Sequence, residues 1–219
     1  MTVLLLDERW PTLIPMEWVG KLSGPVTFHP EVPVKVQWNI SAILDASDSE
    51  SDELYVAFDE DLPEVRERID AGVQVYAVPS REDAVYQAQR VMHRAYSLGE
   101  WERSHTHETL LPYLKEEAAE FAEAVSSGAD DATVKAELAD VFLQVLFHAE
   151  IASRRGAFGI NDVAQAFIDK LRSRAPYLFD GTVFVVDIET QDRLWQEGKR
   201  AELAYAALSQ AEMNTRKGD

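Results

Sequence analysis

The sequence contains no cysteine among its 219 residues. This absence excludes disulfide bonds, thiol catalysis and thiolate metal sites. The sequence also lacks an apolar run approaching the ~20 residues that a membrane-spanning helix needs. Its opening segment, MTVLLLDERW, has an apolar stretch too short for a signal peptide, broken by Asp7. We therefore expect a cytoplasmic protein without a membrane partner.

Basic residues are scarce. The chain has 21 Lys and Arg against 39 Asp and Glu, which gives a formal net charge of -18. Proteins that bind the nucleic-acid backbone need clustered Lys and Arg to displace counterions, so the composition argues against a nucleic-acid partner. It leaves room for a phosphorylated small substrate, provided that a metal ion and a few local cations receive the phosphates.

Residues 1–79 lack a glycine-rich cofactor loop, and their hydrophobic pattern is mixed. We interpret them as a small α/β module that is not catalytic. Nine acidic residues and no basic ones lie between Leu44 and Glu64, on both sides of YVAF. This pattern favours a solvated loop around an edge strand, with an acidic interaction surface as the alternative. The pattern predicts strands at Val3–Leu6, 25–28, 34–38 and 73–78, and helices at 16–22 and 63–71.

From Ser80 onward the pattern becomes helical, so the expected class is α+β overall, with an all-α domain over residues 80–200. Pro112 falls in the first turn of one expected helix, where a missing backbone donor does little harm. Asn161 is a candidate N-cap for another. Residues 201–219 are interpreted as a C-terminal tail, frayed at MNTRKGD. The expected helices cover 82–98, 108–126, 132–153, 161–176 and 189–208.

Two acidic motifs flank a turn signal near Gly128. The run EEAAE supplies Glu116, Glu117 and Glu120, and ELAD supplies Glu137 and Asp140. Since 117 plus 140 equals 120 plus 137, antiparallel helices would place Glu120 opposite Glu137 and Glu117 opposite Asp140. All four would lie at one level, about 13 Å from the turn at ~1.5 Å per residue. Four facing carboxylates repel unless a cation lies among them, and oxygen-only ligands favour Mg²⁺ or Mn²⁺ over zinc.

The helix that carries Glu137 is apolar over most of its circumference, which is typical of a buried helix. Its polar residues form one stripe about 80° wide on a helical wheel at ~100° per residue. Such a stripe faces solvent, partners or an ion, because unpaired buried charge is costly. Each acidic motif alone is more typical of a solvated helix face, but their conjunction favours a metal site. The stripe consists of Glu137, Asp140, Gln144 and His148.

A basic pair follows on the next expected helix. Lys170 and Arg174 are four residues apart and lie on the same side as Val163 and Phe167. They would therefore project beside the packed face, a geometry that suits phosphate capture. An ordinary surface pair is the alternative.

The stretch from about Arg81 to Trp195 resembles a MazG-type nucleoside triphosphate pyrophosphohydrolase of the all-α NTP pyrophosphatase superfamily. The resemblance lies in three segments: GEWERSHTHETLLPYLKEEAAEFAEAV, ELADVFLQVLFHAEIA and FGINDVAQAFIDKLRSRAPYLF. It implies that Lys170 and Arg174 bind phosphates, and that Glu116 supports the site or orients a water. The metal ligands that it implies are Glu117, Glu120, Glu137 and Asp140.

The same resemblance implies an activity and an assembly. A homodimer would hydrolyse (deoxy)nucleoside triphosphates to the monophosphate and pyrophosphate with Mg²⁺, in nucleotide-pool housecleaning. The chain departs from the usual CPWD motif, which here reads GEWE, and keeps Trp101 as a candidate for substrate binding by stacking on a base, with core packing as the alternative. His105 stands where Gln is common, and Ala175 and Tyr177 replace frequent histidines.

Two other functions compete with this interpretation. A non-catalytic nucleotide-binding or regulatory protein is favoured by the acidic extra module and the altered GEWE motif. An oxygen-activating di-iron bundle needs Glu-x-x-His on two helices. The sequence has this spacing only at Glu102 and His105, outside the expected bundle helices. An assay for release of pyrophosphate from nucleoside triphosphates with Mg²⁺ distinguishes these two functions from the pyrophosphohydrolase.

Overall fold

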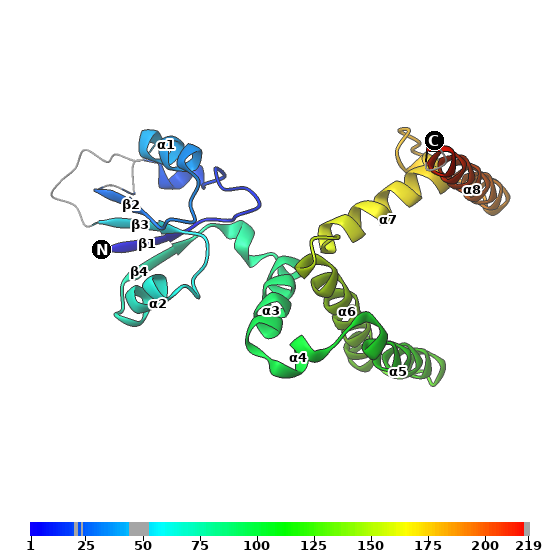
Figure 1. Cartoon of the computed structure of the whole chain (residues 1–219), viewed down its shortest axis with the longest axis horizontal. Helices are drawn as coiled ribbons and strands as arrows, with labels where there is room; N and C mark the ends of the chain where they lie inside the picture. Colours follow the sequence, from blue (N-terminus) through cyan, green and yellow to red (C-terminus); the bar gives the residue numbers. More distant parts are fainter. Residues whose placement is uncertain (20–21, 23, 44–52, 217–219) are drawn as a thin grey trace. The chain divides into compact units, whose positions relative to one another are not determined.

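The computed structural model describes residues 1–19, 22, 24–43 and 53–216. The chain folds as two compact units, Met1–Val91 and Met92–Asp219. The first contains a small sheet with helices, and the second is helical (Figure 1). No described helix is long and apolar enough to cross a membrane.

The sheet of the first unit is entirely parallel. Its strands are β1 (Thr2–Leu5), β2 (Val26–Phe28), β3 (Leu54–Ala57) and β4 (Gln74–Ala77), in the order β2-β3-β1-β4. Val3 pairs with Tyr55 of β3 and with Val75 of β4. Parallel strands need crossover connections, so all four carboxyl ends meet at one edge of the sheet.

Side chains that alternate along β1 and β3 enter two separate cores, as the two-residue period of a strand requires. On one face Leu4 and Val56 pack with Ile40 of α1 (Val34–Ile43). On the other face Leu5 packs with Val65 of α2 (Pro63–Asp70). Because both faces are covered, the inner strands are apolar without interruption.

Three sequence-based predictions fail in this unit. Residues 34–38, predicted as a strand, begin α1, because Val36 and Ile40 are four residues apart and bury one helical face. The strand around YVAF is not at an edge: β3 lies between β2 and β1, and all four of its residues are buried. The helix expected over 16–22 is a 3₁₀ turn at Met16–Trp18. Residues 44–52 of the acidic tract lie outside the described part of the chain.

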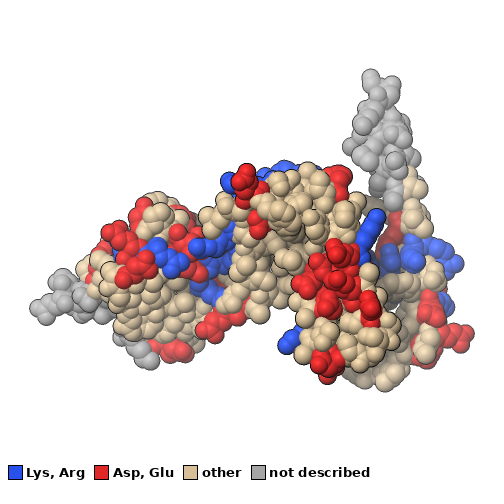
Figure 2. Space-filling view, turned by 90° about the horizontal axis from the view of Figure 1, so that it is seen from below, with Lys and Arg blue, Asp and Glu red and all other residues tan. Residues whose placement is uncertain are grey.

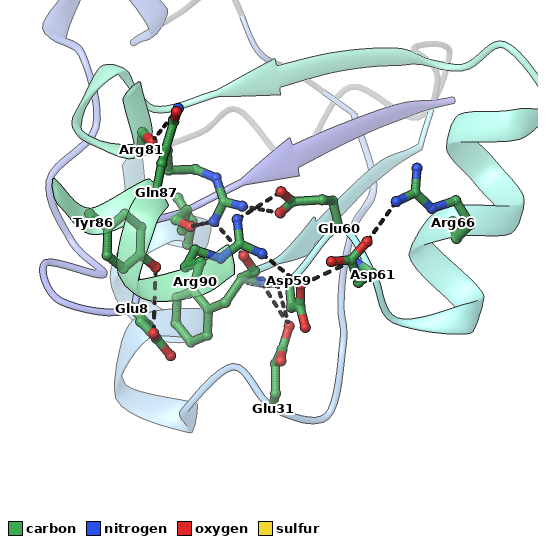
Figure 3. A network of polar contacts seen from close by, with 12 residues as sticks. Glu8, Glu31, Asp59, Glu60, Asp61, Arg66, Arg81, Tyr86, Gln87 and Arg90 are labelled. Atoms are coloured by element: carbon green, nitrogen blue, oxygen red, sulfur yellow. Dashed lines mark hydrogen bonds and ion pairs between the residues drawn. The ribbon is translucent and has the colours of Figure 1, made fainter. Parts of the chain in front are cut away.

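Acidic side chains are numerous on the surface of both units, and basic side chains are distributed unevenly among them (Figure 2). At the carboxyl edge of the sheet the two signs are closely paired (Figure 3). Arg81, which is 6% exposed, donates hydrogen bonds to the carbonyl oxygens of Leu6 (2.8 Å) and Phe58, and it pairs with Glu60. Arg90 binds the second oxygen of Glu60 at 2.7 Å. One buried guanidinium therefore joins the ends of β1 and β3.

The second unit consists of helices, with a longer connection over residues 175–187 between the last two. Helix α3 begins in the first unit, and the short α4 was not predicted from the sequence. Helices α5 and α6 form an antiparallel hairpin around Gly128, whose positive φ of 69° favours glycine. The helices are α3 (Ala84–Leu98), α4 (Glu100–Ser104), α5 (His107–Ser126), α6 (Asp131–Arg154), α7 (Ile160–Arg174) and α8 (Ile188–Arg216).

Side-chain caps fix where the central helices begin. The Thr106 hydroxyl accepts from the backbone N–H of Thr109 at the start of α5, and Asp130 accepts from the N–H of Thr133 at 2.8 Å at the start of α6. Helix α7 begins after Gly159, whose N–H donates to Asp162 at 2.8 Å. The prediction of Asn161 as N-cap is therefore wrong, because the chain turns helical two residues earlier.

Two contacts hold the remaining helices. Glu150 of α6, 9% exposed, binds Arg154 at 2.6 Å and the Nδ1 atom of His93 of α3 at 3.0 Å. Helix α8 crosses α7 closely at Gly198, where a Cβ atom would lie 2.6 Å from the carbonyl oxygen of Ser173.

The expected fraying of MNTR does not occur: α8 continues to Arg216, in a sequence rich in good helix formers.

Candidate metal and nucleotide site

The α5–α6 hairpin gathers the predicted carboxylates. One oxygen from each of Glu117, Glu120 and Glu137 lies within 4.8 Å of the others. Glu117 and Glu137 are partly buried, whereas Glu120 is exposed. Glu120 and Glu137 are mirror-related about the turn, and the antiparallel packing brings them to one level, as the equal sums of residue numbers require.

The electrostatics of Glu117 extend this cluster. Burial raises the pKa of the Glu117 carboxyl, and the charges of neighbouring carboxylates raise it further. Asp140 contributes the largest of these charge effects, followed by Glu120, Glu116 and Glu137. Asp140 and Glu116 are therefore neighbours of the cluster, although neither belongs to the group within 4.8 Å.

These residues fit a hard divalent cation. All are carboxylates, the ligand type that Mg²⁺ and Mn²⁺ prefer. Negative charges at this separation disfavour one another's ionisation, and a bound cation would relieve that cost. Three glutamates from two helices converge here, and this convergence is the chemical feature of the site.

The basic pair of α7 contacts α8. Arg174 donates two hydrogen bonds to the carboxylate of Glu202, at 3.0 and 2.5 Å, and its guanidinium lies 5.2 Å from the ring centre of Trp195. The Arg174 hydrogen bond lowers the pKa of Glu202, and the charge of Lys170 acts in the same direction. The structure therefore places both predicted basic residues near Glu202, a partner that sequence reasoning missed.

Trp101 lies in a group of aromatic rings. Its indole is 51% exposed and makes edge contacts with His105, Tyr113 and Phe147, at centroid distances of 4.1, 5.9 and 5.9 Å. Trp101 therefore packs against these rings, as one of the two alternatives expected, while about half of its surface remains accessible.

A histidine pair completes the polar stripe of α6. The rings of His107 and His148 stack with an interplanar angle of 7°, and their Nδ1 atoms are 2.8 Å apart. Burial lowers the pKa of His148, and the charge of the His107 ring, when that ring is protonated, lowers it further. The sequence analysis missed this contact. The numbers of Glu117 and Asp140, which are predicted to face each other across the turn, add to 257, and 107 plus 148 differs from that sum by only two. The same mirror relation would therefore have predicted the contact.

Comparison with known proteins identifies both units. Residues 1–76 match the MazG N-terminal domain, and residues 105–179 match the MazG nucleotide pyrophosphohydrolase domain. The chain belongs to the MazG family. The pyrophosphohydrolase match includes all the carboxylates of the cluster, and the other match includes the parallel sheet except for the last residue of β4, Ala77.

Similar MazG-family proteins come from several bacteria. The chain is 37% identical to a nucleoside triphosphate pyrophosphohydrolase of Mycolicibacterium smegmatis, over 92% of this chain and 63% of that protein. It is 36% identical to the protein of the same name from Mycobacterium tuberculosis, over 95% of this chain and 65% of that protein. A third relative is the nucleoside triphosphate pyrophosphohydrolase/pyrophosphatase MazG of Thermotoga maritima. The two proteins are 52% identical over a stretch that covers 36% of this chain and 31% of that protein. The chain thus spans somewhat less than two thirds of the two mycobacterial relatives.

Proposed function

We propose that this protein hydrolyses nucleoside triphosphates, ribo- or deoxyribo-, to the monophosphate and pyrophosphate in nucleotide-pool housecleaning. The observation that carries the proposal is the convergence of Glu117, Glu120 and Glu137 within 4.8 Å on two packed helices. The names of the relatives support it, since they are called nucleoside triphosphate pyrophosphohydrolases.

Glu117, Glu120, Glu137 and Asp140 would hold Mg²⁺, or Mn²⁺ in its place. A bound divalent cation would neutralise charge on the phosphate oxygens and make water more acidic. Glu116 orients the attacking water, and a carboxylate of the cluster accepts its proton. The new bond forms between the water oxygen and the α-phosphorus, while the bond from that phosphorus to the bridging oxygen breaks.

Three further residues would bind the substrate. Lys170 and Arg174 hold the departing pyrophosphate, for which Arg174 exchanges its hydrogen bonds with Glu202 for phosphate oxygens. Trp101 stacks on the base through its exposed half. The guanidinium of Arg174 also lies 5.2 Å from the ring centre of Trp195, and a guanidinium can bind a phosphate through two parallel N–H groups.

A homodimer is the assembly that the helical unit supports. Large apolar side chains remain exposed on α6, α7 and α8, although α6 carries the pattern of a buried helix. A second copy would cover these faces, since monomeric proteins rarely expose so many neighbouring apolar groups. The exposed fractions are 51% for Leu138, 42% for Leu143, 57% for Phe167 and 71% for Leu203.

Pyrophosphate release tests the function directly. The full chain is incubated with each canonical or oxidised (deoxy)nucleoside triphosphate and Mg²⁺, and the products are separated. We expect equimolar monophosphate and pyrophosphate, abolished by EDTA and restored by Mg²⁺. Release of orthophosphate would instead indicate cleavage at the terminal phosphate, and binding without any turnover would support the non-catalytic regulatory alternative.

A further inference from the structure

Two buried polar atoms of α6 have no partner within the described residues. They are the side-chain oxygen Oε1 of Gln144 and the ring nitrogen Nε2 of His148. Gln144 is only 5% exposed, so its amide oxygen has left water without gaining a hydrogen bond. Unmade buried hydrogen bonds are rare in proteins, so each one calls for an explanation such as strain, a catalytic role or a bound water or ion.

The contacts of the histidine pair decide what His148 offers. Arg155 donates from Nη2 to Nε2 of His107 at 3.0 Å. Since guanidinium nitrogens only donate, Nε2 of His107 accepts, and the proton of its neutral ring is on Nδ1. That Nδ1–H donates to Nδ1 of His148 at 2.8 Å. The neutral His148 ring, favoured by its lowered pKa, therefore carries its proton on the unpartnered Nε2.

Gln144 and His148 thus present an acceptor and a donor, one turn apart on the same side of α6. Phe147, between them in sequence, contacts the ring of Trp101, and Trp101 also contacts Tyr113. Trp101 and Tyr113 are 51% and 37% exposed. Partly exposed aromatic rings that reach α6 at Phe147, together with one donor and one acceptor on the same helix, match a nucleobase, which has two π-faces and an edge carrying both kinds of group.

The position along α6 fits the same ligand. Gln144 lies one turn beyond Asp140 and His148 two turns beyond it, or ~6 and ~12 Å along the axis at ~1.5 Å per residue. A nucleotide whose phosphates lie at the carboxylates would extend its nucleoside part along this face. The polar stripe of α6 then serves both ends of one substrate.

We propose that Gln144 and His148 recognise the substrate's nucleobase: Oε1 of Gln144 accepts from a base N–H group, and Nε2–H of His148 donates to a base carbonyl or ring nitrogen. This inference rests on the proposed function for the placement of the phosphates. His107 is a positioning residue, which fixes the tautomer of His148. Binding moves aside the side chains that close these atoms off from solvent, and it completes hydrogen bonds that the free chain leaves unmade.

Ligand binding separates this proposal from catalysis. The probes are α,β-methylene nucleoside triphosphates of all four bases, in which the bond to be cleaved is blocked, and inorganic tripolyphosphate, each titrated with Mg²⁺ in a calorimeter. We expect Gln144→Leu and His148→Phe to weaken binding of the preferred nucleotide by about tenfold. Tripolyphosphate binding is expected to stay unchanged. His93→Phe, which removes a histidine that contacts α6 through Glu150, is the matched control and leaves both affinities unchanged.

Equal losses for nucleotide and tripolyphosphate, or folded variants with wild-type nucleotide affinity, would overturn the proposal. A second measurement uses the unmodified protein, in case a variant does not fold. The ¹⁵N chemical shift of Nε2 of His148 should move when the nucleotide binds and stay in place with tripolyphosphate. If the protein discriminates bases but releases no pyrophosphate, the proposed function fails and this inference stands. If pyrophosphate is released while nucleotide and tripolyphosphate bind equally, the inference fails alone.

Discussion

One region in each unit of this MazG-family chain arranges its charges in the opposite way. At the carboxyl edge of the sheet, Glu60 lies between Arg81 and Arg90, and the backbone N–H of Phe58 donates to Glu31 at 2.8 Å (Figure 3). In the helical unit, by contrast, carboxylates face other carboxylates across the α5–α6 interface. The first arrangement satisfies each charge with an opposite one, while the second accumulates charge of one sign.

This difference distinguishes structure from function. Paired charges lower the pKa of Glu60, because the hydrogen bond from Arg90 and the charges of both arginines outweigh the effect of burial. Clustered charges raise the pKa of Glu117, in the same sense as burial. Like charges that lie together disfavour one another's ionisation unless a cation joins them, so we propose the unsatisfied cluster, and not the satisfied network, as the site of chemistry.

The largest expected effect comes from removing one carboxylate of the cluster. Glu120→Gln should lower turnover at least about a hundredfold by deleting a metal ligand. It should leave the melting temperature in EDTA unchanged or higher, because it relieves repulsion. The control is Glu123→Gln, one turn further along α5, which should retain activity. Full activity of Glu120→Gln, or loss of its helicity by circular dichroism, would contradict the assignment.

The converse change breaks the paired network. Arg81→Met leaves the carbonyl oxygens of Leu6 and Phe58 without this donor and removes one of the two arginines that bind Glu60. It should destabilise the first unit by about 3 kcal/mol. Arg66→Met, at an exposed pair with Asp61 in the same unit, should cost less than about 1 kcal/mol. Hydrogen exchange of the β1 and β3 amides in urea measures both. Similar losses in the two variants would mean that burial of Arg81 contributes nothing.

The contrast also shows what the sequence could predict. The α+β class and the pairing of Glu120 with Glu137 follow from local patterns, since helical periodicity and a mirror relation about a turn fix which residues meet. The basic pair required more: Arg174 meets Glu202, nearly thirty residues away, and no short-range period relates them. Sequence alone left open what the polar stripe of α6 faces, because that depends on contacts from other helices.

The errors in the first unit have a physical cause as well. The alternation of Val34, Val36 and Trp38 fits a strand, but the buried positions Val36 and Ile40 fit a helix equally well. Only the packing against the sheet decides between them. The uninterrupted apolar run in YVAF is typical of an interior parallel strand, and the acidic residues around it concealed that signal.

A smaller effect comes from pH. The folded-state pKa of Glu117 is raised, so the metal-free folded protein holds more protons than the unfolded chain between the unfolded and folded pKa values. Its stability should therefore fall as pH rises through that window and recover as pH is lowered. Glu117→Gln removes this contribution, whereas the opposite contribution of Glu60 is common to both proteins. Melting curves in EDTA from pH 4 to 8, an interval around the ordinary Glu pKa of about 4.3, give the difference. Parallel curves would contradict it.

The smallest effect is expected from removing the sheet altogether. A chain beginning at Ser80 loses the partners of Arg81 and Arg90, so the start of α3 should fray. The carboxylate cluster lies on α5 and α6, whose caps at Thr106 and Asp130 are retained. We therefore expect kcat within about tenfold of the full chain, measured after circular dichroism and gel filtration confirm fold and oligomeric state.

The opposite outcome is a folded truncation of unchanged oligomeric state with less than about a hundredth of the activity, a loss of roughly 2.7 kcal/mol in transition-state stabilisation. That result would mean that the sheet unit completes the active site. The proposed division between a structural unit that holds the sheet and a catalytic unit that holds the carboxylate cluster would then be wrong.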